Sequence, residues 1–354
     1  MKRLLISLLK VGLSAAIIGW LVYKAAQTKD QDGNNVFTQL ITQQKRWDLL
    51  LAGWLCCCGA VVLTFIRWWY LVRALDIPLP FRDSIRIGFW GYLVNFLPLG
   101  IVGGDAIKTV MLSREYPGNR AKALASVLVD RVFGLYVLFI VASVAVLATQ
   151  FWRGRPPDIF WICMITLALT AVGTVGLGVV LGPEWLIGPT VRAVARIPRL
   201  GPPLESVINA VRMYNRKPRV LVIASLMTVP VHELNAIGFY LIGCGLFDFS
   251  LSHLSLPAHL VVVPLSTALQ AIPLPAGPTE AGLSYLYPAV MINWAAIVGA
   301  KALTAIARGQ GFAVALAYRL SCLLIAAAGL PYYFGNRREM AELIHEAEAE
   351  DEPH

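Results

Sequence analysis

Two segments of the chain, 175 residues apart, carry side chains that could bind a charged group inside otherwise apolar surroundings. Each has a side-chain amide, a proline three residues later, a run rich in glycine and proline, and a carboxylate seven residues after that first proline. The members of this shared pattern are Asn95, Pro98, Gly103, Gly104 and Asp105 in the first segment and Gln270, Pro273, Gly277 and Glu280 in the second. A half-helix that starts at such a break carries about half a positive charge at its amino end, so each break could hold a phosphate.

The prolines also constrain how the two segments lie in a membrane. Proline lacks the amide hydrogen and clashes with the preceding turn, so neither segment can cross a bilayer as one unbroken helix. We therefore predict two broken re-entrant helical hairpins, over residues 81–112 and 257–307. Helix breaks at matching positions favour a transport site near the middle of the membrane. The alternative is that proline and glycine are simply common in membrane helices.

Ionisable side chains at membrane depth need an explanation. A charge in hydrocarbon costs about 3 kcal/mol on insertion scales, so such residues usually line a cavity or pair with each other. The residues concerned are Arg67, Asp105, Lys108, Asp130, Arg131, Lys301, Arg308 and Arg319. Asp130 and Arg131 point in different directions from one helix, so we expect them to pair across helices, in a structural role or in contact with substrate. Arg319 follows Tyr318 as Arg131 follows Asp130, and is a better candidate phosphate ligand than Arg67.

Several of these residues also have a purely structural interpretation. Asp105 follows two glycines as an N-cap follows a turn, and Glu280 at the start of the matching half-helix could cap in the same way. In the functional interpretation the two carboxylates bind a cationic head group or orient Lys108 and the arginines. Arg67, beside Trp68, is predicted to lie at the cytoplasmic interface and to extend toward lipid phosphates.

A further pair of ionisable residues, His232 and Glu233, follows Pro230 inside a predicted span. His232 could protonate near neutral pH and couple transport to protons. The alternative is a hydrogen-bonded packing group at a proline kink.

The composition is that of an all-α polytopic membrane protein. Of 354 residues 57% are hydrophobic and only 14% are charged, with a mean hydropathy of +0.65, and apolar stretches long enough to cross a bilayer recur along the chain. The six cysteines have no spacing typical of a metal site or redox pair. No nucleotide-binding loop is present either, so we expect no cofactor and no metal.

Apolar runs predict six spans, over residues 4–26, 49–75, 124–149, 159–181, 220–243 and 312–334. They form one transmembrane domain (1–335) of two inverted-topology repeats, about 1–150 and about 155–335, followed by an acidic tail (336–354). The positive-inside rule places the basic connections and both termini in the cytoplasm. Residues 81–89 and 185–197 mix arginine with apolar residues as an in-plane amphipathic helix would.

The first motif and the helix after it resemble a known family. The residues that carry the resemblance are Asn95, Leu97, Pro98, Gly103, Gly104, Asp105, Ser126, Val127, Asp130, Arg131, Gly134 and Leu135. Together they are similar to the flippase-like membrane region of the lysylphosphatidylglycerol synthase family. That resemblance implies a membrane region that moves a lipid, an aminoacylated phosphatidylglycerol, between leaflets. In the bifunctional members of the family, a cytosolic transferase domain makes this lipid.

The chain departs from the family pattern at two positions. Lys108 stands where the family usually has arginine, which keeps the charge but loses a bidentate fork for phosphate. Pro278 replaces one glycine of the second motif. The chain ends at His354, soon after the last predicted span, so we expect no transferase domain.

The sequence therefore predicts a translocase that moves a phosphate-bearing lipid between the leaflets of the cytoplasmic membrane. A lipid-modifying enzyme and a non-transporting scaffold for such an enzyme are the alternatives. Membrane lipids are the expected partners. A second copy of the chain, in a homo-oligomer, or a lipid-synthesising enzyme are further candidate partners. Nucleic acid is not an expected partner, because the basic residues abut membrane spans.

Overall fold

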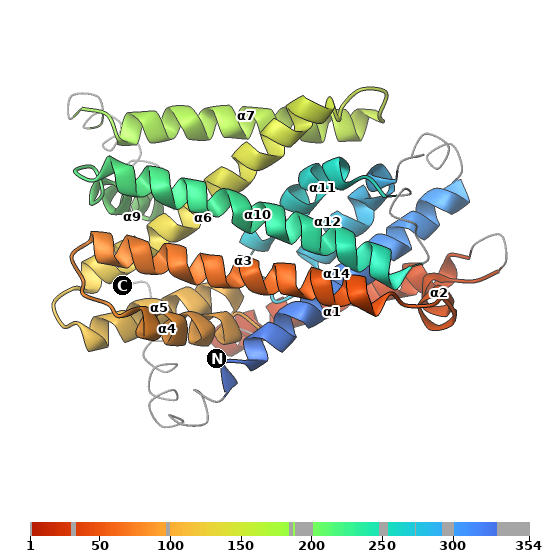
Figure 1. The fold of residues 1–354 in the computed structure, drawn as a ribbon, viewed down its shortest axis with the longest axis horizontal. Coiled ribbons are helices and arrows are strands. Elements are labelled where there is room, and N and C mark those ends of the chain that lie inside the picture. The colour runs from red at the N-terminus through yellow and green to blue at the C-terminus, as the bar shows by residue number, and fades with distance from the viewer. Residues whose placement is uncertain are drawn as a thin grey trace.

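The computed structural model describes residues 2–29, 33–96, 100–183, 187, 201–247, 254–272, 274–291 and 301–330. Their secondary structure is helical, with only two isolated β-bridges. Within these ranges, six helices are long and apolar enough to cross a membrane: α1 (Lys2–Gln27), α3 (Trp47–Ala74), α6 (Arg120–Thr149), α7 (Pro157–Val180), α10 (Pro218–Leu246) and α14 (Lys301–Ala327). Figure 1 shows them as an elongated bundle. The predicted all-α polytopic membrane fold is confirmed.

The last span is displaced from its predicted position. α14 begins at Lys301, whereas the sequence placed this start at residue 312. The sequence assigned residues up to 307 to the second hairpin, whereas polar side chains in the first turns of α14 find partners inside the fold: Gln310 donates to the side-chain oxygen of Gln39 at 3.1 Å, and Arg308 lies over the ring of Tyr285. A short helix between the first two spans, α2 (Val36–Thr42), was not predicted.

The first broken segment forms an antiparallel helical hairpin of α4 (Phe81–Val94) and α5 (Gly100–Glu115). At its base Arg86 pairs with Glu115, and nearer the tip Gly91 faces Gly104 and Lys108. The prediction of an in-plane helix over residues 81–89 was wrong. α4 is one arm of the hairpin and is buried against α3 and α5, as its inward residues show: Ser84, Ile87, Gly88, Trp90 and Gly91.

The second broken segment also turns back on itself. α11 (Leu256–Ala268) and the short 3-10 helix η1 (Leu269–Ala271) form one arm, and α12 (Pro278–Leu286) and η2 (Tyr287–Val290) form the other. The arms meet at the base, where the amide of Ser255 donates to the carbonyl of Val290 at 2.7 Å. Toward the tip Gly282 packs against Leu269 and Ser266. Both broken segments are therefore helical hairpins, and their re-entrant position in the membrane stays a prediction.

The two hairpins enter from opposite ends of the bundle. α3 and α10 are antiparallel, because Gly53 near the start of α3 meets Ile242 near the end of α10. The first hairpin's base is tied to the end of α3, where Trp69 donates to the carbonyl of Leu79 at 2.9 Å. The second hairpin's base packs on Gly243 near the end of α10. Figure 1 accordingly shows α4 and α5 toward one end and α11 and α12 toward the other. This arrangement fits the predicted inverted repeats, whose internal symmetry stays a prediction.

Three other sequence predictions fall on residues outside the described ranges. Pro98 and Pro273 lie there, as do the acidic tail (336–354) and nearly all of the predicted amphipathic stretch 185–197. A different helix, α9 (Gly201–Arg212), packs on α6 and α7 near the same end as the first hairpin's base.

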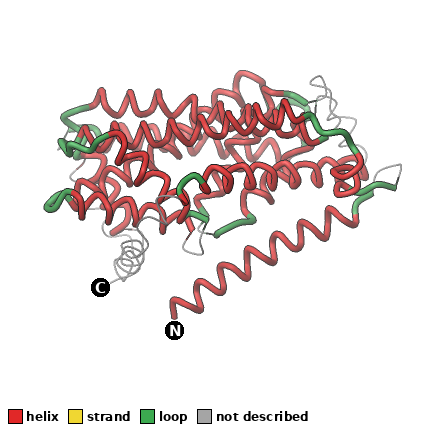
Figure 2. Tube along the Cα trace, turned by 60° about the horizontal axis from the view of Figure 1, so that its bottom comes forward, coloured by secondary structure: helices red, strands yellow, loops and turns green. Residues whose placement is uncertain are grey.

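α1 lies at the edge of the bundle, at an angle to the other helices (Figure 2). It touches the second hairpin close to its tip, where the amide of Ala276 donates to the Ser14 hydroxyl at 3.4 Å and Ile17 packs on Gly277. Large apolar side chains on the outside of the spans, such as Leu55, Val172 and Leu226, are exposed as a lipid-facing surface requires.

The close contact between α4 and α5 predicts a stability effect. A Cβ atom at Gly104 would collide with the carbonyl oxygen of Gly91 and the side-chain amide of Asn95. We expect Gly104→Ala to lower the free energy of unfolding by about 1–3 kcal/mol, because the hairpin arms would have to separate. Thermal unfolding of the purified protein measures this. Gly176→Ala on α7 is the matched control, since no atom lies within 4 Å of its Cβ position. Equal unfolding temperatures for the two variants would contradict the close contact.

Candidate functional site

Two cavities meet in the middle of the bundle, between the hairpins. The first-hairpin chamber, of about 530 Å³, is lined by α3, α4, α5, α6, α10, α11 and η1. The second-hairpin chamber, of about 260 Å³, lies among the tip of the second hairpin, α3, α4, α10 and α14. The two linings share Val61, Thr64, Tyr92, Asn95 and Gln270. The amides that open the two motifs, Asn95 and Gln270, therefore border both chambers.

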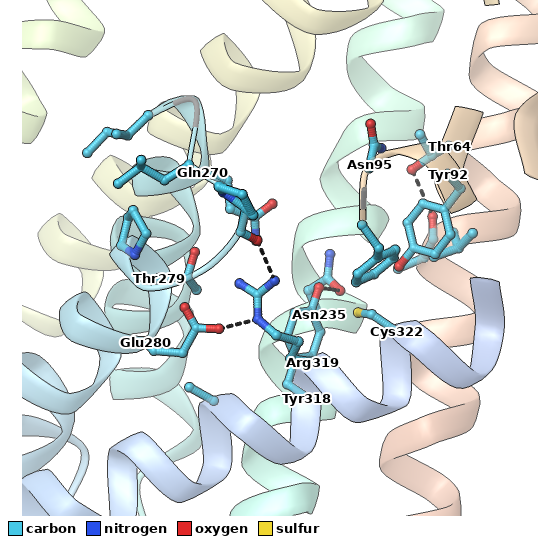
Figure 3. A pocket seen from close by; sticks show the side chains of 18 of the residues that line it. Thr64, Tyr92, Asn95, Asn235, Gln270, Thr279, Glu280, Tyr318, Arg319 and Cys322 are labelled. Atoms are coloured by element: carbon cyan, nitrogen blue, oxygen red, sulfur yellow. Dashed lines mark hydrogen bonds and ion pairs between the residues drawn. The ribbon is translucent and has the colours of Figure 1, made fainter. Parts of the chain in front are cut away.

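An acid–base pair forms one wall of the second-hairpin chamber (Figure 3). One carboxylate oxygen of Glu280 accepts the amide hydrogen of Gly277 at 2.8 Å, and the other accepts a hydrogen bond from Nε of Arg319. Nη1 of Arg319 also donates to the carbonyl of Pro275 at 2.9 Å. Glu280 therefore caps its half-helix as predicted and in addition binds the predicted arginine. Its side chain is 1% exposed, so the ion pair is shielded on the carboxylate side.

A second acid–base pair lines the first-hairpin chamber. Asp105 on α5 accepts a hydrogen bond from Nε of Arg131 on α6, and the ammonium of Lys108 lies 5.3 Å from the ring centroid of Trp68. The interpretation of Asp105 as an N-cap was wrong, because α5 begins at Gly100 and Asp105 lies in its second turn. Gly103 and Gly104 are helical, and Gly104 allows close contact with α4 rather than a turn.

A buried arginine joins three spans beside the first-hairpin chamber. Nε of Arg67 donates to Asp130 at 2.7 Å, Nη1 donates to the hydroxyl of Thr228 at 2.8 Å, and Nη2 is 3.3 Å from the Asp130 carbonyl. Gly134 leaves the space that the guanidinium fills. The prediction that Arg67 lies at the membrane interface was wrong: the residue is 5% exposed. The expectation that Asp130 pairs across helices is confirmed.

The polar contacts around the two chambers occupy equivalent places in the two halves. In each half an arginine on the span after the hairpin binds a carboxylate on the hairpin's second arm. The residue before that arginine contacts the span that precedes the hairpin: Asp130 binds Arg67, and the hydroxyl of Tyr318 donates to Asn235 at 3.2 Å. This correspondence agrees with the sequence match between Asp130–Arg131 and Tyr318–Arg319.

The two ionisable residues after Pro230 have different places. Nε2 of His232 lies 3.0 Å from the carbonyl oxygen of Gly134, to which it can donate, and the side chain lines the first-hairpin chamber. Glu233 is exposed on the outside of α10 and lines neither chamber. Glu233 points away from both chambers because it lies one residue, and thus about 100°, around the helix from His232.

Sequence reasoning missed several residues of the site. Thr64, Tyr92 and Asn235 line the chambers, and Asn235 lies only two residues after Glu233. Tyr92 precedes Asn95 by one helical turn, so the helical period was the signal that could have identified it. Asn235 had no signal of its own beyond being a polar residue at membrane depth.

The first-hairpin chamber has an excess of positive charge. Its lining contains three cationic side chains and two carboxylates. Two of the cations, Arg67 and Arg131, form ion pairs with Asp130 and Asp105. Lys108 is the remaining one: its ammonium lies over the face of Trp68, and it also interacts electrostatically with Asp105. A cavity with this charge at membrane depth is suited to an anionic group such as phosphate.

Comparison with protein families gives one match. The family model described as the lysylphosphatidylglycerol synthase TM region matches residues 7–329. No curated protein matches the chain. Among the described residues, no group of three or more histidine, cysteine, aspartate and glutamate side chains is placed to hold a metal ion.

Proposed function

Because the chain belongs to the lysylphosphatidylglycerol synthase TM-region family, which suggests a membrane lipid-related role, we propose that it is a lipid translocase. It moves a phosphate-bearing lipid between the leaflets of the cytoplasmic membrane, with both chain termini in the cytoplasm. The lipid head group passes through the two chambers, and the acyl chains stay in the bilayer.

One observation carries this proposal. Each of the two hairpins, which come from opposite ends of the bundle, contributes a carboxylate that pairs with an arginine: Asp105 with Arg131 and Glu280 with Arg319. These pairs line two chambers whose walls share the side-chain amides of Asn95 and Gln270. Transport sites at the meeting point of broken helices near mid-membrane are a recurrent arrangement. Four ionisable groups at this depth would be costly without a function that uses them.

The pairs suggest how a head group could be held and released. In the resting state each carboxylate neutralises its arginine, so the chamber is stable without substrate. A lipid phosphate can compete for the arginine, because guanidinium binds carboxylate and phosphate with the same bidentate geometry. Lys108 supplies the extra positive charge that favours an anion over a neutral head group. Return of the arginine to its carboxylate then releases the phosphate.

Reconstitution in liposomes tests this function. A phospholipid labelled on an acyl chain is placed in both leaflets, and a membrane-impermeant reductant reports how much of it reaches the outer leaflet. Movement of the intact lipid supports a translocase. A change in lipid mass would instead show a lipid-modifying enzyme, and neither change would show a scaffold.

Lys108 should control which lipids move. We expect Lys108→Gln to lower the rate at which anionic phosphatidylglycerol moves between leaflets about tenfold relative to the rate for zwitterionic phosphatidylcholine. The reason is that one charge-assisted contact is worth about 1.5–3 kcal/mol. Lys108→Arg, which keeps the charge, should retain the preference. The ratio of the two initial rates in the liposome assay is the measurement. An equal loss for both lipids would assign Lys108 a structural role against Trp68.

A further inference from the structure

The first-hairpin chamber is open where α6 meets the tip of the second hairpin. On α6, Leu135 lines the chamber and is nevertheless 40% exposed. On the second hairpin, Gln270 and Ala271 line the same chamber and are exposed. Ile272, which lines the adjoining second-hairpin chamber, is 44% exposed. On the α3 wall of the first-hairpin chamber, by contrast, Arg67 is buried. We call the exposed part of the lining, formed by these residues of α6 and the second hairpin, the side opening.

The depth of the side opening places it in hydrocarbon. α6 runs from Arg120 to Thr149, and Leu135 lies at its middle. A rise of 1.5 Å per residue puts Leu135 about 20 Å from either end of the helix, which is well inside a hydrocarbon core of about 30 Å. Farther along α6, Val144 is 60% exposed, as expected of a helix that faces lipid. A molecule that enters through the side opening therefore comes from the region of the acyl chains.

A buried core closes the same chamber toward the base of the first hairpin. Aromatic and aliphatic side chains of α3, α4 and α5 pack together there and are at most 4% exposed: Trp68, Ile87, Trp90, Ile107 and Met111. They lie between the chamber-lining residues and the ends of the hairpin arms. The space between the arms thus gives no passage from water to the chamber in this structure, which leaves the side opening as the exposed approach along the first hairpin.

The side opening combines apolar and polar groups in the way that a lipid requires. Leu135 and Ile272 present apolar side chains to the outside. Behind them, the side chain of Arg131 is 38% exposed although it pairs with Asp105, and the amide of Gln270 borders both chambers. An exposed guanidinium at this depth is stable only where it faces a polar cavity or ligand. An acyl chain gains from contact with the apolar groups, whereas a free phosphate does not.

We propose that the head group of an anionic phospholipid enters the first-hairpin chamber directly from the bilayer, through the side opening. This inference rests on the proposed function, because it says where the transported lipid enters the same chambers. The head group turns inward to Arg131 and Gln270, and the acyl chains stay outside along α6. Leu135 and Ala271 set the width of the opening from its two sides and act as positioning residues.

Photocrosslinking tests the side opening without requiring lipid movement. The protein is reconstituted in phosphatidylcholine liposomes that carry a head-group photoreactive phosphatidylglycerol in both leaflets, and crosslinked peptides are identified by mass spectrometry. We expect adducts in the segments around Lys108 and Arg131. Leu135→Trp and Ala271→Trp each place a large ring in the opening from one side, and each should lower these adducts about tenfold, because a bulky group in a narrow space opposes entry.

Val144→Trp is the matched control. It adds the same ring to the exposed face of α6 but lines neither chamber, so the adducts should stay at the parent level. The thermal unfolding temperatures of the three tryptophan variants should agree, since every substituted side chain is exposed. The two blocking variants lie on different elements, so a folding defect in one of them leaves the other as the test.

The outcomes separate this inference from the proposed function. Parent-like adducts in a correctly folded Leu135→Trp or Ala271→Trp protein would overturn the side opening, even if lipid still moves. Loss of the adducts when glycerol 3-phosphate is added to the aqueous phase at low millimolar concentration would also overturn it, because a head group without acyl chains would then reach the chamber from water. Adducts that depend on Leu135 and Ala271, in a protein that moves no lipid, would count against the translocase and support the side opening.

Discussion

Lipid movement should fall at least about thirtyfold when Asp105 becomes asparagine and Glu280 becomes glutamine in one protein, because truncating a partner of a buried charge pair costs about 2–5 kcal/mol. Without the carboxylates, no anionic side chain of the two pairs competes with a bound phosphate for Arg131 and Arg319, so the phosphate is released more slowly. The liposome assay measures the rate. Protein yield should stay close to the parent, since glutamine can still accept the Gly277 amide hydrogen as Glu280 does.

The control for this variant is a carboxylate at similar depth that lines neither chamber. Glu233→Gln changes the exposed outer face of α10, and we expect it to leave lipid movement at the parent rate. The single variants Asp105→Asn and Glu280→Gln show whether each pair is needed. Parent-like movement in the double variant would discard the assignment of the site to these residues.

Breaking the buried Arg67 network should have the largest effect on stability. Arg67→Gln leaves Asp130 buried without its cation and Thr228 without its donor. We expect the free energy of unfolding to fall by about 3–5 kcal/mol, because an uncompensated charge remains inside the bundle. Thermal unfolding of the detergent-solubilised protein measures the loss. An unchanged unfolding temperature would contradict the burial of this arginine.

A double variant separates charge from packing at the same place. Arg67→Met/Asp130→Leu removes both charges and fills similar volume, and apolar replacement of a buried ion pair is often close to neutral. We therefore expect it to recover most of the stability that Arg67→Gln loses. Failure to recover would show that the hydrogen bonds to α10, rather than the neutralisation of Asp130, hold these spans together.

The sequence was sufficient to predict the parts of the fold that depend on local physics. Hydropathy located the six spans because about twenty apolar residues are needed to cross a bilayer. The prolines located both hairpins because each removes a hydrogen bond that a continuous helix requires. The 175-residue offset between the two motifs then identified Asp105 and Glu280 as equivalent carboxylates. Arg131 and Arg319 were identified as equivalent because the helices after the two motifs match in sequence.

The errors came from contacts between residues far apart in sequence. Arg67 looked interfacial because its neighbours are tryptophans, whereas its position is set by Asp130, 63 residues later. The glycines before Asp105 looked like a turn, but Gly104 is needed where α5 touches α4. A pair of glycines in a sequence is compatible both with a turn and with a close contact between helices, so only the position of the partner helix distinguishes the two. The start of α14 was missed because Gln310 finds its partner on α2.

The central claim is that the chambers between the hairpins bind a lipid phosphate, and a structure in lipid nanodiscs tests it most directly. We expect cryo-electron microscopy of the protein in phosphatidylglycerol-containing nanodiscs to show phosphate density within about 3 Å of a guanidinium or ammonium nitrogen of Arg131 or Lys108. Anionic lipid on the outer surface alone, with the two chambers empty or filled only by acyl chains, would contradict it.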